Sequence, residues 1–243
     1  MTRVLAGISL SAILVFCSTV AADRGLASLY AHPGKSSLAL WRAGKHSLLL
    51  YDWNVVRSSL EKGLSYDGHN PDLLHELGAA HEAEVAYFPP GATAAGNHRD
   101  TARKYYLESL AGRPTWPHDW IDLALVDYRL DRINGEFYQA MHQALTLGPW
   151  ESRVQYVAAD IGMHHWYKFD DEMKNIITGV IHDGIRNRDN AMTMLKLVGR
   201  YDMLELACGD DNGGEEVRKY CEHYQRHLSP SPASAGEGRG EGP

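Results

Sequence analysis

The stretch that decides the fold runs from residue 102 to residue 124 and reads ARKYYLESLAGRPTWPHDWIDLA. It contains Ala102-x3-Tyr106, then Pro114, then Trp120-x2-Leu123-Ala124. Apolar and small residues recur at helical spacing on both sides of the proline. Proline ends a helix or opens the next one, so the stretch predicts two helices joined by a short turn.

This register resembles the tetratricopeptide repeat, a helix pair with Trp-x2-Leu-Gly in its first helix, Ala-x3-Phe in its second and then proline. The resemblance implies an all-α fold: a right-handed solenoid of stacked helix-turn-helix pairs, each stabilised by its neighbours. The small positions are where the two helices of a pair come close together. The expected repeat positions are Leu74, Leu77, Gly78, Ala102, Tyr106, Pro114, Trp120, Leu123, Ala124 and Pro149.

The spacing of these positions tests the register. Pro114 and Pro149 are 35 residues apart, close to the 34-residue repeat. Gly78 and Ala124 are 46 residues apart, which requires an insertion between them. The run FPPGATAAGN at 88–97 has the composition of a loop and accounts for most of the excess.

Helical periodicity predicts helices over about 23–43, 53–64, 71–86, 98–111, 117–130, 134–147, 151–165, 170–181, 188–199 and 215–228. Asn70 before Pro71 and Asn134 before its helix are typical N-caps, and Gly148 ends a helix. The repeat consensus is not found after residue 160. We therefore expect repeats over 23–165, a divergent helical cap over 166–228 and a disordered tail over 229–243.

The N-terminus differs from the rest of the chain. Arg3 precedes an uncharged run from Val4 to Ala22, and small residues stand at the positions before a signal-peptidase site after Ala22. Residues 1–22 therefore predict a signal peptide and a periplasmic or secreted protein. The alternative is an uncleaved anchor over residues 4–22 in the inner membrane.

Export changes the interpretation of the three cysteines, because exported proteins meet an oxidising compartment. Cys17 leaves with the signal peptide. Cys208 and Cys221 flank a turn-like segment at 209–214, so a disulfide between two helices is expected, with two separate, partly buried thiols as the alternative.

The sequence offers little for catalysis or for a metal. His75 and His81 are six residues apart, whereas two histidines on one helix face of a zinc protease are four apart. His164-His165 and the group Cys221, His223 and His227 are weak candidates, because Cys221 is better assigned to the disulfide. We expect no catalytic residues, no metal and no cofactor. The net charge of −7 disfavours nucleic acid as a partner.

The better candidate is the concave surface that the first helix of each pair lines in such stacks. It mixes acids, histidines, arginines and aromatic residues, and it could bind an extended peptide or a glycan. The alternative is an ordinary solvated face with no ligand. The residues expected there are Asp72, His75, Glu76, Glu82, His118, Asp122, Arg129, Arg153, Tyr156 and Asp160, with Ala79, Ile121, Leu125, Val157 and His164 between them.

Beyond the repeat consensus, RPTWPHDWIDLALV at 113–126 and ALTLGPWE at 144–151 resemble bacterial VpsP-type polysaccharide-biosynthesis proteins. The resemblance implies an exported, non-enzymatic scaffold or adaptor in exopolysaccharide biosynthesis or export, with envelope or polysaccharide-assembly proteins, or glycan, as partners. It carries over no catalytic residues.

Two alternatives stay open. One is a general periplasmic module that binds peptides or proteins. The other is a polysaccharide hydrolase or lyase that works in the groove with two opposed carboxylates. Glu76 or Glu82 with Asp122 or Asp160 is the pair to examine in that case.

Overall fold

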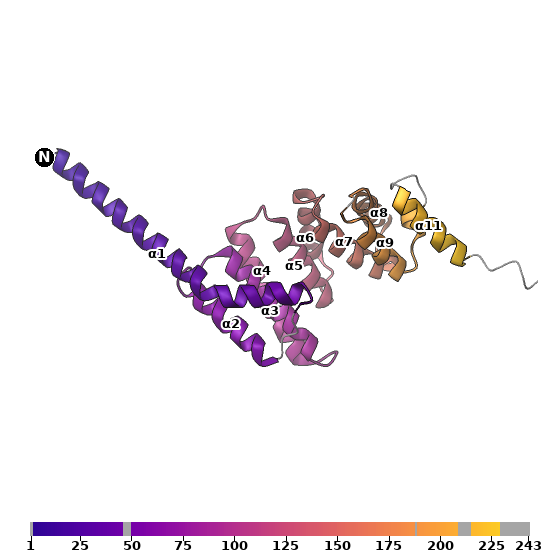
Figure 1. Ribbon diagram of the computed structural model, residues 1–243, viewed down its shortest axis with the longest axis horizontal. Helices are drawn as coiled ribbons and strands as arrows, with labels where there is room; N and C mark the ends of the chain where they lie inside the picture. Colours follow the sequence, from indigo (N-terminus) through magenta and orange to yellow (C-terminus); the bar gives the residue numbers. More distant parts are fainter. Residues whose placement is uncertain (1, 46–49, 188, 209–214, 229–243) are drawn as a thin grey trace, which may run out of the picture. The chain divides into compact units, whose positions relative to one another are not determined.

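The computed structural model describes residues 2–45, 50–187, 189–208 and 215–228. Over these ranges the regular secondary structure is helical and contains no strand, which confirms the all-α class (Figure 1). The break expected near His46, the turn at 209–214 and the tail at 229–243 lie wholly or partly outside them. The chain divides into two compact units, Met1–Gly148 and Pro149–Pro243.

Each helix of the first unit packs against the next one along the chain. Each of these helices therefore buries its apolar face mainly against its neighbours along the chain. The helices are α1 (Thr2–Arg42), α2 (Leu50–Leu64), α3 (Pro71–Glu84), the short 3₁₀ helix η1 (Val85–Tyr87), α4 (Thr93–Gly112), α5 (Pro117–Arg129) and α6 (Gly135–Leu147).

The helix starts follow from local chemistry. The Asn70 side-chain oxygen accepts hydrogen bonds from the backbone N–H groups of Asp72 and Leu73, 3.1 and 3.2 Å away, and Pro71 opens α3. Asn134 caps α6 in the same way. These bonds satisfy amides that have no partner within the helix. Both caps were predicted from the sequence and are confirmed.

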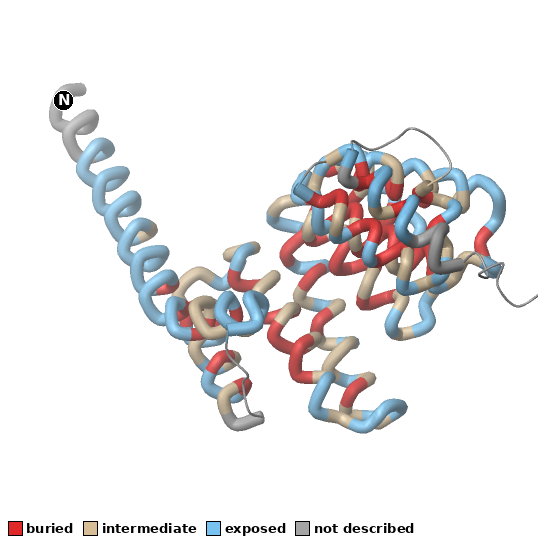
Figure 2. Tube along the Cα trace, turned by 45° about the vertical axis from the view of Figure 1, so that its right-hand side comes forward, coloured by how far each residue is buried: buried red, intermediate tan, exposed pale blue. Residues whose placement is uncertain are grey.

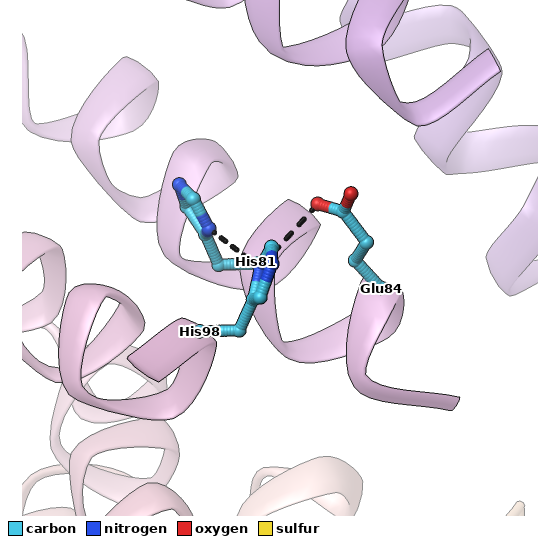
Figure 3. Close-up of side chains that lie close together, drawn as sticks. All are labelled: His81, Glu84 and His98. Carbon is cyan, nitrogen blue, oxygen red and sulfur yellow. Dashed lines mark hydrogen bonds and ion pairs between the residues drawn. The ribbon is translucent and has the colours of Figure 1, made fainter. Parts of the chain in front are cut away.

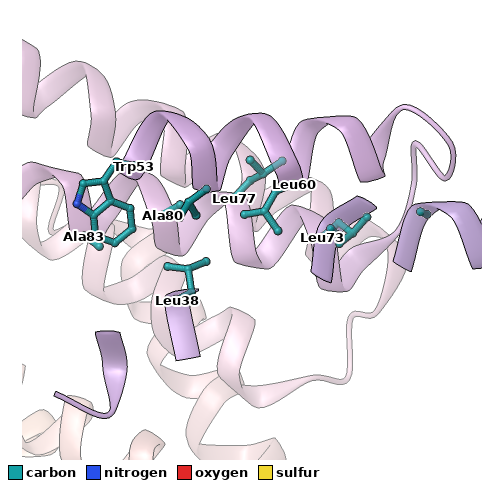
Figure 4. Packing of buried hydrophobic residues seen from close by; sticks show 10 residues of the cluster. Leu38, Trp53, Leu60, Leu73, Leu77, Ala80 and Ala83 are labelled. Atoms are coloured by element: carbon teal, nitrogen blue, oxygen red, sulfur yellow. The ribbon is translucent and has the colours of Figure 1, made fainter. Parts of the chain in front are cut away.

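The core of the first three helices explains why α1 continues into the folded unit. Ala27, Ala31 and Leu38 of α1 are buried on one helix face, and they pack with Trp53 and Leu60 of α2 (Figure 4). The α3 side chains Leu73, Leu77, Ala80 and Ala83 complete this cluster. In contrast, residues 9–22 of α1 are exposed almost throughout (Figure 2).

Three helices differ by five residues or more from the expectation: α1, α4 and α8 (Asp171–Arg186), which was expected to end near residue 181. The short α10 (Glu205–Cys208) was not expected. The structure has one continuous helix from Thr2 to Arg42, where a separate helix starting near residue 23 was expected. It also begins α4 at Thr93, inside the expected insertion, which leaves only residues 88–92 between η1 and α4. Ala94 and Ala95 are strong helix formers and extend α4 backwards.

The close approach expected at Gly78 is present. A Cβ added there would lie 2.7 Å from the Tyr106 Cε1 atom, so the α3 backbone rests directly on the Tyr106 ring of α4. Among the other repeat positions, Trp120 is half-buried and its Nε1–H donates to the Pro114 carbonyl at 2.7 Å. Fully buried are Leu74, Leu77, Ala102, Tyr106, Leu123 and Ala124, whereas Pro114 is exposed and Pro149 is half-buried.

The second unit begins at Pro149, before the boundary expected at residue 165, because α7 packs against α8 and α9. A disulfide joins Cys208 to Cys221, with their Cα atoms 5.8 Å apart. It links α10 to α11. The helices of this unit are α7 (Ser152–His164), the 3₁₀ helix η2 (Trp166–Lys168), α8 (Asp171–Arg186), α9 (Ala191–Arg200), α10 (Glu205–Cys208) and α11 (Glu215–Leu228).

Candidate functional site

The candidate groove residues of the first unit lie on α3 and α5, where charged side chains connect the two helices. His75 of α3 lies with Nδ1 2.6 Å from Asp119 Oδ1 and with Nε2 3.8 Å from Asp122 Oδ2. Further along the same helices, Glu82 forms an ion pair with Arg129. The residues expected to face a ligand are therefore largely engaged with one another.

Asp119 is the centre of this network, although the sequence did not single it out. It is fully buried at the start of α5. Arg113 donates to both of its oxygens, at 2.7 and 3.0 Å, and the Ser109 hydroxyl donates at 2.6 Å. Burial acts to raise the pKa of Asp119, but the bonds from His75, Arg113 and Ser109 outweigh it and hold that pKa below its usual value. Asp119 is thus an ionised structural anchor between α3, α4 and α5.

The remaining acids of α3 are also paired. Arg42 of α1 makes two hydrogen bonds to the Glu76 carboxylate, at 2.8 and 3.2 Å. Arg113 reaches Asp72 at 2.5 Å. Arginines from outside the expected groove therefore pair with two of its carboxylates, Glu76 and Asp72.

The last candidate on α5 is His118, which is half-buried with its ring centroid 5.5 Å from that of Trp116. Trp116 is exposed and the Arg113 guanidinium lies 5.4 Å from its ring centroid. This aromatic and cationic group at the start of α5 is suited to contact a partner.

Three candidates belong to the second unit. Arg153 of α7 is exposed, Tyr156 is half-buried, and the Asp160 carboxylate accepts a hydrogen bond from the Tyr201 hydroxyl at 2.8 Å. A groove that runs from α3 through α5 to α7 would cross from one unit to the other. The groove residues on α3 and α5 are therefore described together, and those on α7 are described separately.

A second cluster lies on the other side of α3 and was not predicted. His81 and Glu84 project from α3 and His98 projects from α4, so that the three side chains point toward one another (Figure 3). His81 Nδ1 is 3.1 Å from His98 Nδ1, and His98 Nδ1 is 3.4 Å from Glu84 Oε2. One ligand atom from each residue lies within 4.8 Å of the other two.

The surroundings hold the cluster in place. Arg57 of α2 lies with Nε 3.1 Å from Glu84 Oε2 and with Nη2 3.4 Å from Glu84 Oε1, and it donates to Asn54 at 2.6 Å. The His81 ring stacks on Tyr105 with centroids 5.7 Å apart. His81 and Glu84 are buried, whereas His98 is half-buried.

Burial is the main cause that lowers the pKa of His81 to about 4, and the positive charge of Arg57 and the neighbouring His98 add to it. The imidazole of His81 is therefore neutral at neutral pH. Its Nδ1 atom shares one hydrogen-bond contact with the Nδ1 of His98.

Sequence reasoning missed this cluster for a clear reason. It tested His81 against His75 on the same helix, and the two are not on one face. The actual neighbour, His98, is 17 residues away in sequence, beyond the insertion. The spacing His81-x2-Glu84 was the available signal, since residues three apart share a helix face.

Among the described residues, the metal-like group of His81, Glu84 and His98 includes none of the other histidine candidates. The rings of His164 and His165 stack with centroids 5.7 Å apart, and Cys221 is held in the disulfide. The side chain of His227 lies outside the described residues.

No protein-family model matches the chain, and no curated protein sequence matches it.

Proposed function

We propose that this protein is an exported, non-enzymatic adaptor built from tetratricopeptide-like helix pairs, and that it holds protein components of exopolysaccharide biosynthesis or export together. The consecutive packing of α1 to α6 and the contact of Gly78 with Tyr106 support a repeat stack. Such stacks present extended surfaces that bind other proteins.

The observation that carries the proposal is that the candidate carboxylates are bound by partners within the protein. A glycosidase needs two carboxyl groups across a substrate cleft, one of which acts as a general acid. Here Glu76 is held by Arg42, Glu82 by Arg129, Asp122 lies near His75, and Asp160 accepts from Tyr201. Acids fixed in this way by their own structural partners favour a binding surface over a hydrolytic centre.

Two features support export. Within α1, the part from Ser9 onward contains a stretch that is long and apolar enough to cross a membrane, as a signal sequence or an anchor does. The disulfide between Cys208 and Cys221 forms in oxidising compartments. A periplasmic or secreted location, with or without a retained membrane anchor, fits both.

The test is site-specific photocrosslinking in cells that make the exopolysaccharide. A photoreactive residue replaces His118 or Arg129 on α5, and a control replaces the exposed Leu107 on α4. We expect the α5 positions to crosslink to a glycosyltransferase or an export component, and Leu107 not to. Crosslinks from α5 to many unrelated proteins would instead indicate a general peptide-binding module.

A second assay addresses the enzymatic alternative. Purified protein is incubated with the isolated exopolysaccharide, and new reducing ends or unsaturated sugars are measured. Release that disappears in both Glu82→Gln and Asp122→Asn would overturn the adaptor proposal.

A further inference from the structure

We propose that His81, Glu84 and His98 form a binding site for a divalent transition-metal ion, with zinc as the probe, at the base of the segment that joins α3 to α4. The proposal is independent of the adaptor role, because it rests on the geometry of these three side chains alone (Figure 3).

Two of the three distances between ligand atoms fit a tetrahedral ion, and the third is at most 4.8 Å. Nitrogen and oxygen ligands lie about 2.0–2.2 Å from zinc, so two ligands of a tetrahedral ion are about 3.3 Å apart. The two imidazole Nδ1 atoms are 3.1 Å apart, and His98 Nδ1 and Glu84 Oε2 are 3.4 Å apart. An ion can therefore be placed between the three donors with small side-chain adjustments, and it would displace the proton shared by the two histidines.

The donors are held before any ion arrives. Tyr105 stacks on the His81 ring, and the Phe88 ring lies 5.1 Å from that of His98. Arg57 approaches both Glu84 oxygens, so it can keep Oε1 through Nη2 while Oε2 turns to the ion. Glu84 Oε2 is ion-paired with Arg57 Nε at 3.1 Å, and binding the ion would exchange this contact for a bond to the metal.

The ligand types select the class of metal. Two imidazole nitrogens and one carboxylate oxygen suit zinc and its neighbours in the first transition row. Magnesium and calcium prefer sites made of oxygen atoms. Calcium is therefore a useful negative probe.

The position of the site suggests what the ion does. Glu84 is the last residue of α3 and His98 lies in the second turn of α4, so the ion would tie together both ends of residues 85–97. Three protein ligands leave a fourth position for water or for a group from a partner, and the half-buried His98 marks the side open to solvent.

The test uses the full chain, purified in mild detergent without a histidine tag, freed of metal with a chelator and titrated with zinc against a chromophoric competitor. We expect the wild-type protein to bind one zinc ion per chain through these three residues. His81→Gln, Glu84→Gln and His98→Gln should each weaken binding about 100-fold or more, since even changes to groups that only orient the ligands cost about 10–100-fold.

Matched controls separate this site from adventitious binding. His142→Gln removes an exposed histidine of α6, and Glu172→Gln removes an exposed carboxylate of α8. Both should keep zinc affinity within about threefold, well below that loss. Calcium at the same concentration should not bind. Equal zinc affinity in the wild type and in all three ligand variants, or no zinc binding to the wild type, would overturn the proposal.

Loss of folding is excluded by circular dichroism of each metal-free variant. His98→Gln is the most informative one, because His98 is half-buried and its replacement disturbs the core least. Cobalt gives a second readout. Its visible absorption should show tetrahedral nitrogen and oxygen ligation in the wild type and should be lost in His98→Gln, and a spectrum unchanged in that variant would count against the site.

Discussion

At the scale of single residues, Asp119 is the side chain on which the first unit depends most. Its carboxylate is fully buried and bound by groups from α3 and from the end of α4. Asp119→Asn keeps the size but removes the buried anion of Arg113, which then keeps the more exposed Asp72, and we expect a loss on the order of 3 kcal/mol in the free energy of unfolding. Urea unfolding of the wild type and the variant measures this loss. Asp100→Asn is the control, because its pair with Arg132 is half-exposed and should contribute less than about 1 kcal/mol.

The same residue sets a pH dependence. The pKa of Asp119 is lower in the folded protein than its ordinary value, so the unfolded chain binds the proton more tightly. The stabilisation is fully present above about pH 4 and is lost as the pH falls through the folded-state pKa. The stability difference between wild type and Asp119→Asn should therefore be constant from neutral pH to about pH 5 and shrink below pH 4. A difference that stays constant down to about pH 3 would contradict this assignment.

Gly78 gives a second prediction at this scale. The space for a Cβ there is taken by the Tyr106 ring, so Gly78→Ala must displace either that buried ring or the α3 backbone. We expect a loss of about 1–3 kcal/mol, the usual cost of overpacking. Gly96→Ala in α4 meets nothing within 4 Å and should be neutral or stabilising by up to about 1 kcal/mol, because alanine favours helices. Thermal unfolding of both variants compares them directly, and an equal effect would show that the close contact has no energetic weight.

At the scale of helices, α1 should divide into a part that the fold needs and a part that it does not. Leu38 is buried against α2 and α3, whereas Leu40, two residues later on the same helix, is half exposed. Leu38→Ala should cost about 2–5 kcal/mol and Leu40→Ala less than about 0.5 kcal/mol. Equal losses would mean that the end of α1 does not pack as described.

Removal of residues 1–22 provides the complementary measurement. A chain that begins at Asp23 keeps every α1 side chain of the buried core, so its unfolding should match that of the longer chain. The intact mass of protein from its native host then shows whether cleavage after Ala22 takes place or the apolar segment stays as an anchor.

The helices also show what the sequence could and could not predict. Caps such as Asn70 and Asn134 are local, and sequence reasoning located them correctly. The start of α4 at Thr93 was missed, because glycines and prolines near it masked two alanines that favour a helix. The cluster of His81, Glu84 and His98 was missed because it depends on how α3 packs on α4, and spacing along one helix contains no information about that contact.

At the scale of the whole molecule, the charged residues of the expected groove also show what sequence reasoning could not predict. Helical register placed His75 and Glu82 on one helix and Arg129 on a later one, and the structure pairs Glu82 with Arg129 and His75 with Asp119. Register could not show that these groups satisfy one another. That pairing depends on whether the side chains of α3 are long enough to contact those of α5. Because they are, much of the charge expected in the groove is paired within the protein.

The two units provide the last prediction, because each is compact by itself and the disulfide lies within the second one. The disulfide from Cys208 to Cys221 closes a short loop within the second unit, and the Cys208→Ser and Cys221→Ser double variant should lose about 3 kcal/mol there. Asp119→Asn acts on the first unit. Combined in one chain, these changes share no partner, so their effects should add to within about 0.5 kcal/mol. Calorimetry should show two transitions, one lowered by each change, and a single transition that both changes lower together would mean that the units unfold as one.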